Sequence, residues 1–261
     1  MFRKAGGIQM ILEKFALSGK TAIVTGARTG LGKGMAVGLS EAGADLAIVN
    51  RSPMPETEEE IRKLGRRCLP IEADLSNTNV IPEIVKRTLD EFGKIDILVN
   101  NAGIIRRAPS IEFTEKDWDD VINVNLKAVF FLSQAVAREM IKNNGGKIIN
   151  IASMLSFQGG VLVPSYAASK GGVASLTKTL ANEWAKYNIN VNAIAPGYMA
   201  TNNTEPLRKD DERNKSILDR IPEGRWGLPE DLKGAVVYLA SEASDYVTGH
   251  ILCVDGGWLA R

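Results

Sequence analysis

The stretch TAIVTGARTGLGKGM, residues 21–35, decides the fold. Its first five residues suit a buried strand, and Gly26, Gly30 and Gly32 follow before a helical pattern begins. Glycines let the backbone turn tightly and approach a pyrophosphate, and the N-terminus of the next helix offers free N–H groups to the anion. The spacing G-x3-G-x-G differs from the common G-x-G-x-x-G fingerprint, but its place between strand and helix is that of a nucleotide-binding turn.

The rest of the chain repeats this alternation of strand and helix. Short runs rich in Val and Ile predict seven strands, and these runs lack the apolar–polar alternation of a half-exposed sheet. The runs are at 21–25, 45–50, 68–72, 95–100, 147–152, 190–195 and 251–255. Helix-length stretches between them include 32–42, 117–143, 165–187 and 229–241. We therefore expect one doubly wound α/β domain.

Composition and charge exclude several classes of protein. Of the 261 residues, 44% are hydrophobic and 24% are charged, and 32 basic side chains balance 31 acidic ones. This balance argues against a nucleic acid or an anionic membrane as partner, because either needs a basic surplus. No apolar run reaches the roughly 18 residues of a membrane helix, and no signal-peptide core is recognisable, so we expect a cytoplasmic protein.

A single histidine and two cysteines restrict the chemistry further. His250 starts an apolar run and is expected at a strand edge, so we expect neither a zinc site of several imidazoles nor a Ser-His-Asp triad. Cys68 and Cys253 lie in apolar strand-like runs and are expected to be reduced core residues. If this is an enzyme, we expect no metal and an acid–base group other than histidine.

Two segments depart from the strand–helix rhythm. Residues 205–215 carry eight charges in eleven positions, so we expect a mobile surface excursion, with 198–225 as a substrate lid. Residues 1–9 precede a second methionine, Met10, have no periodic pattern and are expected to be disordered. The chain is thus divided into an N-terminal extension, 1–16, and one catalytic domain, 17–261.

Polar residues follow the third and fourth predicted strands. After the third comes Asp74-Leu75, whose carboxylate could accept a hydrogen bond from an adenine amino group, although a helix N-cap or turn residue is the simpler interpretation. The fourth closes with Asn100-Asn101-Ala102-Gly103. Open α/β sheets bind ligands at the carboxyl ends of their strands, so both stretches are candidates for cofactor contacts.

Tyr166 and Lys170 are the candidates for acid–base chemistry. They are four residues apart in the helical stretch YAASK, so they share one helix face. A tyrosine with a pKa of about 10 is a weak acid–base group at neutral pH, and an adjacent ammonium lowers that pKa. Taken alone, such a pair is usually an exposed helix face, and Ser153 and Asn125 are equally unremarkable alone.

Together these residues resemble the short-chain dehydrogenase/reductase family. The matches come in the family's order and at its spacings, and the resemblance spans residues 17–261. They are TGARTGLG at 25–32, NNAG at 100–103, Asn125, Ser153, YAASK at 166–170 and PG at 196–197. The resemblance implies a single Rossmann-like domain with a seven-stranded parallel sheet flanked by helices. It also implies an NAD(P)-dependent oxidoreductase acting on CH–OH groups, and a homotetramer.

The resemblance further assigns roles to single residues. Tyr166 would be the general acid in reduction and the base in oxidation, and Lys170 would lower the pKa of Tyr166 and hold the nicotinamide ribose. Ser153 would hydrogen-bond the substrate oxygen, and Asn125 would position a water for proton relay. The cofactor would contact Gly26, Arg28, Thr29, Gly30, Leu31, Gly32, Asn50, Arg51, Asp74, Leu75, Asn101, Ala102, Gly103, Tyr166, Lys170, Pro196, Gly197, Met199 and Thr201.

The end of the second predicted strand leaves the choice of cofactor open. Asn50 stands where members that prefer NAD usually have an acid, and the Arg51 guanidinium could pair with a 2′-phosphate. We favour NAD(H) from the closer resemblance described next, and we expect NADP(H) to be used as well.

Several loops resemble those of a subgroup that acts on deoxy sugar acids, among them KIINIASMLSFQGG (147–160) and VDGGWLAR (254–261). Such a substrate carries a carboxylate, which a guanidinium binds through two parallel hydrogen bonds. The candidate substrate residues are Arg106, Arg107, Gln158 and Arg213, with Arg208 as a competitor. The alternatives are a gluconate 5-dehydrogenase, a 3-oxoacyl-thioester reductase and a sensor that binds a nucleotide without catalysis.

Overall fold

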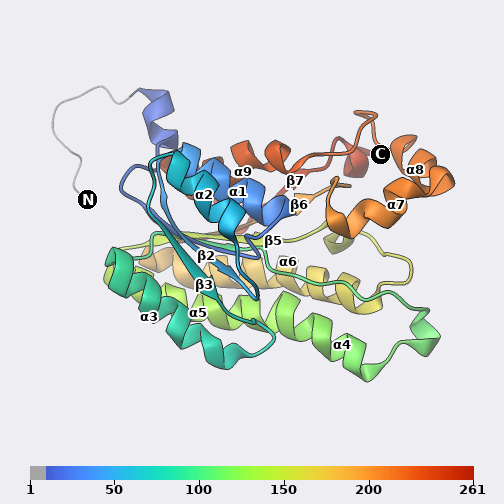
Figure 1. Ribbon diagram of the computed structural model, residues 1–261, viewed down its shortest axis with the longest axis horizontal. Coiled ribbons are helices and arrows are strands. Elements are labelled where there is room, and N and C mark those ends of the chain that lie inside the picture. The colour runs from blue at the N-terminus through green and yellow to red at the C-terminus, as the bar shows by residue number, and fades with distance from the viewer. Residues whose placement is uncertain (1–9) are drawn as a thin grey trace.

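The fold is built on one seven-stranded parallel sheet (Figure 1). The structure is a computed structural model, and it describes residues 10–261. The strands lie in the order β3-β2-β1-β4-β5-β6-β7. They are β1 Thr21–Thr25, β2 Asp45–Asn50, β3 Cys68–Glu72, β4 Ile97–Asn100, β5 Gly146–Ile151, β6 Ile189–Pro196 and β7 Ile251–Val254. The predicted sheet is confirmed, while the expected disorder of residues 1–9 falls outside the described residues.

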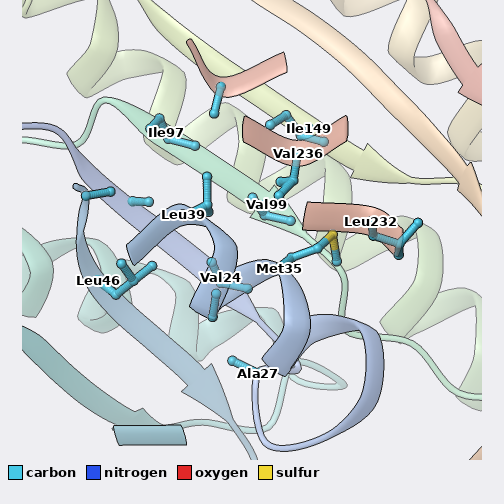
Figure 2. Close-up of a cluster of buried hydrophobic side chains, with 14 of the residues drawn as sticks. Val24, Ala27, Met35, Leu39, Leu46, Ile97, Val99, Ile149, Leu232 and Val236 are labelled. Atoms are coloured by element: carbon cyan, nitrogen blue, oxygen red, sulfur yellow. The ribbon is translucent and has the colours of Figure 1, made fainter. Parts of the chain in front are cut away.

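Helices cover both faces of the sheet, which explains why the strands lack apolar–polar alternation. Within β1, Val24 packs on one face and Ile23 on the other, and both are fully buried. Figure 2 shows the core on the first face, where Met35 and Leu39 of α1 lie over Val24. Each fully buried side chain of this size contributes about 1.5–3 kcal/mol through removal from water. The strands are therefore fixed from both sides, and so are the loops at their carboxyl ends.

The α-helices include the four stretches predicted from the sequence, one of them with an interruption. They are α1 Gly30–Glu41, α2 Pro55–Lys63, α3 Ile81–Phe92, α4 Glu115–Ile122, α5 Ala128–Lys142, α6 Pro164–Trp184, α7 Glu205–Lys209, α8 Asp211–Leu218 and α9 Lys233–Ala240. The helix predicted over 117–143 is broken by a π-helix at Asn123–Lys127, in which the N–H of Ala128 donates to the carbonyl oxygen of Asn123. Such wide turns frequently mark functional sites.

The charged segment 205–215, expected to be a mobile surface excursion, is helical and mostly exposed. It forms α7 and α8, which project beside the C-terminal end of the chain (Figure 1). Ile217 of α8 is buried in a small core with Met154, Ile221 and Trp258. Its helical form has a local cause as well, because the Asp210 side chain caps α8. The segment thus combines a charged surface with one apolar anchor, and its expected role as a mobile lid stays a prediction.

The cysteines also correct an expectation. The strand order puts β3 and β7 at the two edges of the sheet, so Cys253 of β7 is exposed and Cys68 of β3 is half-buried. Both thiols are free, as expected, but Cys253 is not a core residue. Burial raises the pKa of Cys68 to about 12. The error arose because a four-residue apolar run does not reveal whether its strand is central or at an edge.

Three further sequence expectations concern the histidine, membrane helices and metal sites. His250 is exposed and directly precedes β7, in agreement with a strand-edge residue. Within residues 10–261 no helix is long and apolar enough to cross a membrane. In that same part of the chain no cluster of three or more His, Cys, Asp or Glu side chains is placed to hold a metal ion.

Candidate active site

The glycine-rich turn between β1 and α1 is packed against the loop that follows β4. A Cβ atom on Gly32 would lie 2.2 Å from the carbonyl oxygen of Gly26 and 2.4 Å from Nδ2 of Asn101, so no larger residue fits there. Asn101 Nδ2 donates to the carbonyl oxygens of Thr25, at 2.9 Å, and Gly26, at 3.2 Å. The turn is therefore held from outside by Asn101, and α1 begins directly after it, as an anion site at a helix N-terminus requires.

A polar cluster lies where β2 ends, next to this turn. Arg28 Nη1 donates to Ser52 Oγ at 3.2 Å, and Asn50 Nδ2 donates to the carbonyl oxygen and to Oγ of Ser52, both at 3.0 Å. Arg51, between Asn50 and Ser52, is exposed. Sequence reasoning missed Ser52 because it lies beyond the strand and in no motif. Guanidinium, amide and hydroxyl donors together suit a phosphate.

The other predicted cofactor residues flank the turn. Asp74 lies two residues beyond β3, and its Oδ1 accepts from the N–H of Ser76 at 2.9 Å, so the turn interpretation is confirmed for this exposed carboxylate. Thr201 approaches from the opposite side, where a Cβ on Gly30 would meet its Cγ2 at 3.4 Å. Pro196, Gly197 and Met199 lie on the same segment, at and just after the end of β6.

Ser153, Tyr166 and Lys170 are brought together by β5 and α6. β5 ends at Ile151, and Ser153 Oγ accepts from the N–H of Leu155 at 3.1 Å as the next turn begins. On α6, Lys170 Nζ lies 5.5 Å from the centre of the Tyr166 ring. The same Nζ donates to the carbonyl oxygen of Ile151 at 2.5 Å. Three residues predicted from separate parts of the sequence therefore share one site.

The pKa values of Tyr166 and Lys170 depend chiefly on burial. Burial raises the pKa of Tyr166, while its hydrogen bond with Ser153 and the positive charge of Arg107 act to lower it. Burial lowers the pKa of Lys170 to about 8. The influences that lower the pKa of Tyr166 here come from Ser153 and Arg107, and the Lys170 ammonium donates to a backbone carbonyl, so the expected lowering by Lys170 stays a prediction. Perturbed neighbouring groups of this kind are typical of catalytic sites.

Asn125 lies in the π-helix and holds the loop that follows β4. Its Oδ1 accepts from the N–H of Ile104 at 2.8 Å, and its Nδ2 donates to the carbonyl oxygen of Ile104 at 2.9 Å. Nδ2 also lies 3.3 Å from Ser169 Oγ on α6. Asn125 thus links the loop that carries Arg106 and Arg107 to the helix that carries the tyrosine. Its expected role toward a water molecule stays a prediction.

The structure separates the two candidate arginines of this loop. Arg106 is paired with Asp117 and Asp120 of α4, both at 3.3 Å. Arg107 is exposed, and its Nη2 donates only weakly, at 3.4 Å, to the carbonyl oxygen of Asn203. Within the described residues no carboxylate pairs with Arg107. Because Arg107 also acts on the pKa of Tyr166, it is the arginine with a charge available in the site.

The remaining candidates lie in the segment 198–225 and on the loop after Ser153. Gln158 Oε1 accepts from Arg220 Nη2 and from Trp258 Nε1, both at 3.3 Å. Arg208 Nη2 donates to the carbonyl oxygen of Thr201 at 3.1 Å. Arg213 is exposed on α8, and nothing in the geometry draws its guanidinium into the site.

This arrangement agrees with what comparison with known proteins shows. The family model described as short chain dehydrogenase matches residues 20–212. The chain belongs to the short-chain dehydrogenase family. It is an NAD(P)-dependent oxidoreductase, and the resemblance that the motifs suggested is confirmed.

Relatives within the family include several enzymes of sugar-acid metabolism. The chain is 63% identical to 2-dehydro-3-deoxy-D-gluconate 5-dehydrogenase of Escherichia coli (strain K12), over 97% of this chain and 100% of the relative. A protein of Agrobacterium tumefaciens provisionally named 2-deoxy-D-gluconate 3-dehydrogenase, crystallised with NADP, is 56% identical with a TM-score of 0.90, covering 95% of this chain and 99% of the other. Gluconate 5-dehydrogenase of Burkholderia cenocepacia J2315, in complex with NADP and tartrate, is 40% identical with a TM-score of 0.92. The match covers 97% of this chain and 100% of the other.

Proposed function

We propose that this enzyme transfers a hydride between a nicotinamide cofactor and a keto or hydroxy carbon of a deoxy sugar acid. The reaction would be of the 2-dehydro-3-deoxy-D-gluconate 5-dehydrogenase or 2-deoxy-D-gluconate 3-dehydrogenase type. The observation that carries the proposal is Arg107, a guanidinium without a carboxylate partner among residues 10–261 that acts on Tyr166. It would supply a cation for the acid group of a substrate whose carbonyl faces the Tyr166 hydroxyl. The sugar-acid relatives support the same class of substrate.

The residues present fit a nicotinamide dinucleotide. The turn around Gly32 leaves no space for a side chain, as close approach of a pyrophosphate to the backbone requires. The cofactor's phosphates would lie at the N-terminus of α1, and Lys170 would hold the ribose next to the nicotinamide. When bound, the cofactor supplies or accepts the hydride. The donors of Arg28 and Arg51 at the end of β2 support use of NADP(H), while the sequence subgroup favours NAD(H), so we propose that both are used.

Tyr166 would move the proton that balances the hydride. In reduction its hydroxyl donates a proton to the substrate oxygen as the carbon receives hydride, and in oxidation the phenolate accepts that proton. Ser153, hydrogen-bonded to Tyr166, would donate to the same substrate oxygen and stabilise its developing negative charge. Asn125 would keep the loop after β4 in place during the reaction.

Arg107 would bind the carboxylate and thereby orient the substrate. Orientation matters because a sugar acid presents several carbons and only one must face the cofactor. Arg106 is unsuited to this role, since Asp117 and Asp120 already neutralise it. The ion pairs of Arg106 therefore support Arg107 as the residue that binds the carboxylate.

A spectrophotometric assay at about 340 nm, where the reduced nicotinamide absorbs, tests this function. NADH and NADPH are each offered with keto sugar acids, with a keto sugar that lacks the carboxylate, and with a 3-oxoacyl thioester. We expect turnover of a keto sugar acid well above that of the other two. Turnover of the thioester alone would exclude the sugar-acid function, and absence of all turnover despite cofactor binding would favour a sensor.

Two further sequence expectations stay predictions under this proposal, the homotetramer and the cytoplasmic location. Light scattering at micromolar concentration tests the first. A mass of 28.3 kDa, that of one chain, would contradict it.

A further inference from the structure

Gln158 joins three segments that are far apart in the sequence. It lies on the loop after Ser153, and its N–H donates to the carbonyl oxygen of Met154 at 3.2 Å. Its Oε1 accepts from Arg220, at the end of the lid, and from Trp258, near the C-terminal end. The Arg220 guanidinium in turn lies 4.0 Å from the centre of the Trp258 ring. The side chain is thus held from two directions.

The two partners also decide which way the amide faces. Arg220 and Trp258 offer only hydrogens, because neither a guanidinium nor an indole N–H can accept a hydrogen bond. The amide must therefore turn its oxygen toward both, which occupies the two lone pairs of Oε1. Nε2 and its two hydrogens face away from them. Within the described residues no group accepts from Nε2, so this donor is available to a ligand.

The partners are themselves held firmly. Trp258 is 4% exposed and packs in the small core with Met154 and Ile217, and its ring meets that of Tyr198 edge-on at 4.7 Å. The carbonyl oxygen of Arg220 accepts from Nε of Arg261 at 3.2 Å. The orientation of Gln158 is therefore set before any substrate arrives.

We infer that Gln158 donates its Nε2 hydrogens to a hydroxyl or keto oxygen of the bound sugar acid, and that Arg220 and Trp258 are positioning residues that keep this donor in place. The inference rests on the proposed function. Gln158 follows Ser153 by five residues on one short loop, and its N–H is bonded to Met154, the neighbour of Ser153; from this we infer that its donor serves the same substrate. Arg107 binds the carboxylate at one end of the molecule, and Gln158 fixes a second oxygen. Two fixed points select the carbon that is oxidised or reduced.

Gln158→Glu tests the donor because a carboxylate still accepts from Arg220 and Trp258 but offers no hydrogen to the substrate. We expect the KM of the sugar acid to rise about fivefold to tenfold, the loss of one hydrogen bond, with kcat and the Kd of NADH changed less than twofold. The keto sugar without a carboxylate is assayed in parallel, because charge repulsion cannot affect it. A rise in KM for both substrates supports the inference. A rise in KM for the acid alone, or for neither substrate, overturns the inference.

Arg220→Met tests the positioning role at an exposed residue, because methionine can still pack on the Trp258 ring but cannot donate to Gln158. We expect a rise in KM of about twofold to fivefold in the otherwise unchanged protein and no further rise in the Gln158→Glu background, because the donor is already absent there. If the two substitutions raise KM independently, so that their effects multiply in the double variant, the positioning role is overturned. Thermal unfolding confirms that both variants fold. If the unchanged enzyme reduces no keto sugar acid at all, the proposed function fails, a result distinct from normal turnover that is insensitive to Gln158.

Discussion

The cofactor half and the substrate half of the site are held together by different means. In the cofactor half, glycine backbone packs on backbone, and Asn101 joins the turn to the loop after β4 at 2.9–3.2 Å. In the substrate half, long side chains reach across from distant segments, as Arg107 does to Asn203 at 3.4 Å and Gln158 to Trp258 at 3.3 Å. Backbone packing admits almost no substitution, whereas long side chains can be exchanged. The comparison suggests why one family binds one cofactor class and many substrates.

Tyr166 stands where the two halves meet, so its removal should produce the largest effect. Tyr166→Phe removes the only proposed proton donor to the substrate oxygen while the glycine-rich turn stays intact. We expect kcat to fall about 100- to 10,000-fold, with the Kd of the cofactor nearly unchanged. Exposed Tyr187→Phe is the matched control. A kcat within threefold of the unchanged enzyme would refute the role of Tyr166.

Arg107→Met should affect the substrate half alone. We expect a loss of about 1.5–3 kcal/mol in kcat/KM on the sugar acid and little loss on the uncharged keto sugar. Arg106→Met is the control, because Arg106 is bound to two carboxylates of α4. It should lower the unfolding temperature slightly and leave the preference for the acid unchanged. Equal losses on both substrates in Arg107→Met would show a structural role.

Lys170 belongs to both halves, and its pKa gives a test by pH. Its pKa is about 8 in the folded protein against an ordinary 10.5, so the unfolded chain binds more protons between these values. The contribution of Lys170 to the unfolding free energy therefore rises with pH across this window, and burial of its ammonium is most unfavourable below pH 8. The unfolding free energy of Lys170→Met should exceed that of the unchanged protein by up to about 3 kcal/mol at pH 7. Denaturation at pH 7 and 10 should show this gain shrinking; a constant difference would contradict the prediction.

Gly32→Ala should break the cofactor half by a single methyl group. The new Cβ would lie 2.2 Å from the Gly26 carbonyl oxygen, so the turn must open. We expect a loss of about 1–3 kcal/mol in unfolding free energy and weaker cofactor binding. The control is Gly234→Ala in α9, where nothing lies within 4 Å and a gain of about 1 kcal/mol is expected from helix propensity. Unchanged NADH binding by Gly32→Ala would contradict the prediction, because it would show that the turn accommodates a methyl group without opening.

Arg51→Ala should have the smallest effect and tests the edge of the cofactor half. Arg51 is exposed, so its pairing with a 2′-phosphate is partly screened by solvent. We expect the Kd of NADPH to rise about fivefold and that of NADH to stay the same. Titration of both cofactors by fluorescence measures the two values. An equal rise for both would place Arg51 outside phosphate recognition.

The two halves also differ in how well the sequence predicts them. The strand, the turn and the first helix follow from residues 21–35 because each step depends on neighbours in the chain. The spacing of four residues predicts that Tyr166 and Lys170 share a helix face, and the whole set of family motifs then predicts their role. By contrast, Gln158 meets Trp258 across 100 positions, and only the fold reveals that Arg106 is neutralised by α4 while Arg107 is not. The exposure of Cys253 likewise depends on the order of the strands in the sheet, which cannot be predicted from a short run of residues.

The π-helix at Asn123–Lys127 has a consequence for insertions and deletions. A π-turn holds one residue more than an α-turn, so removal of a single residue here would leave a regular helix from α4 into α5 without disturbing hydrogen bonding. It would nevertheless remove the wide turn itself, because the extra residue is what this turn accommodates. The side chain of Asn125 would then be displaced from Ile104 and Ser169, although α4 and α5 could keep their places. The number of residues in this turn is thus a constraint on the site that no substitution scan would detect.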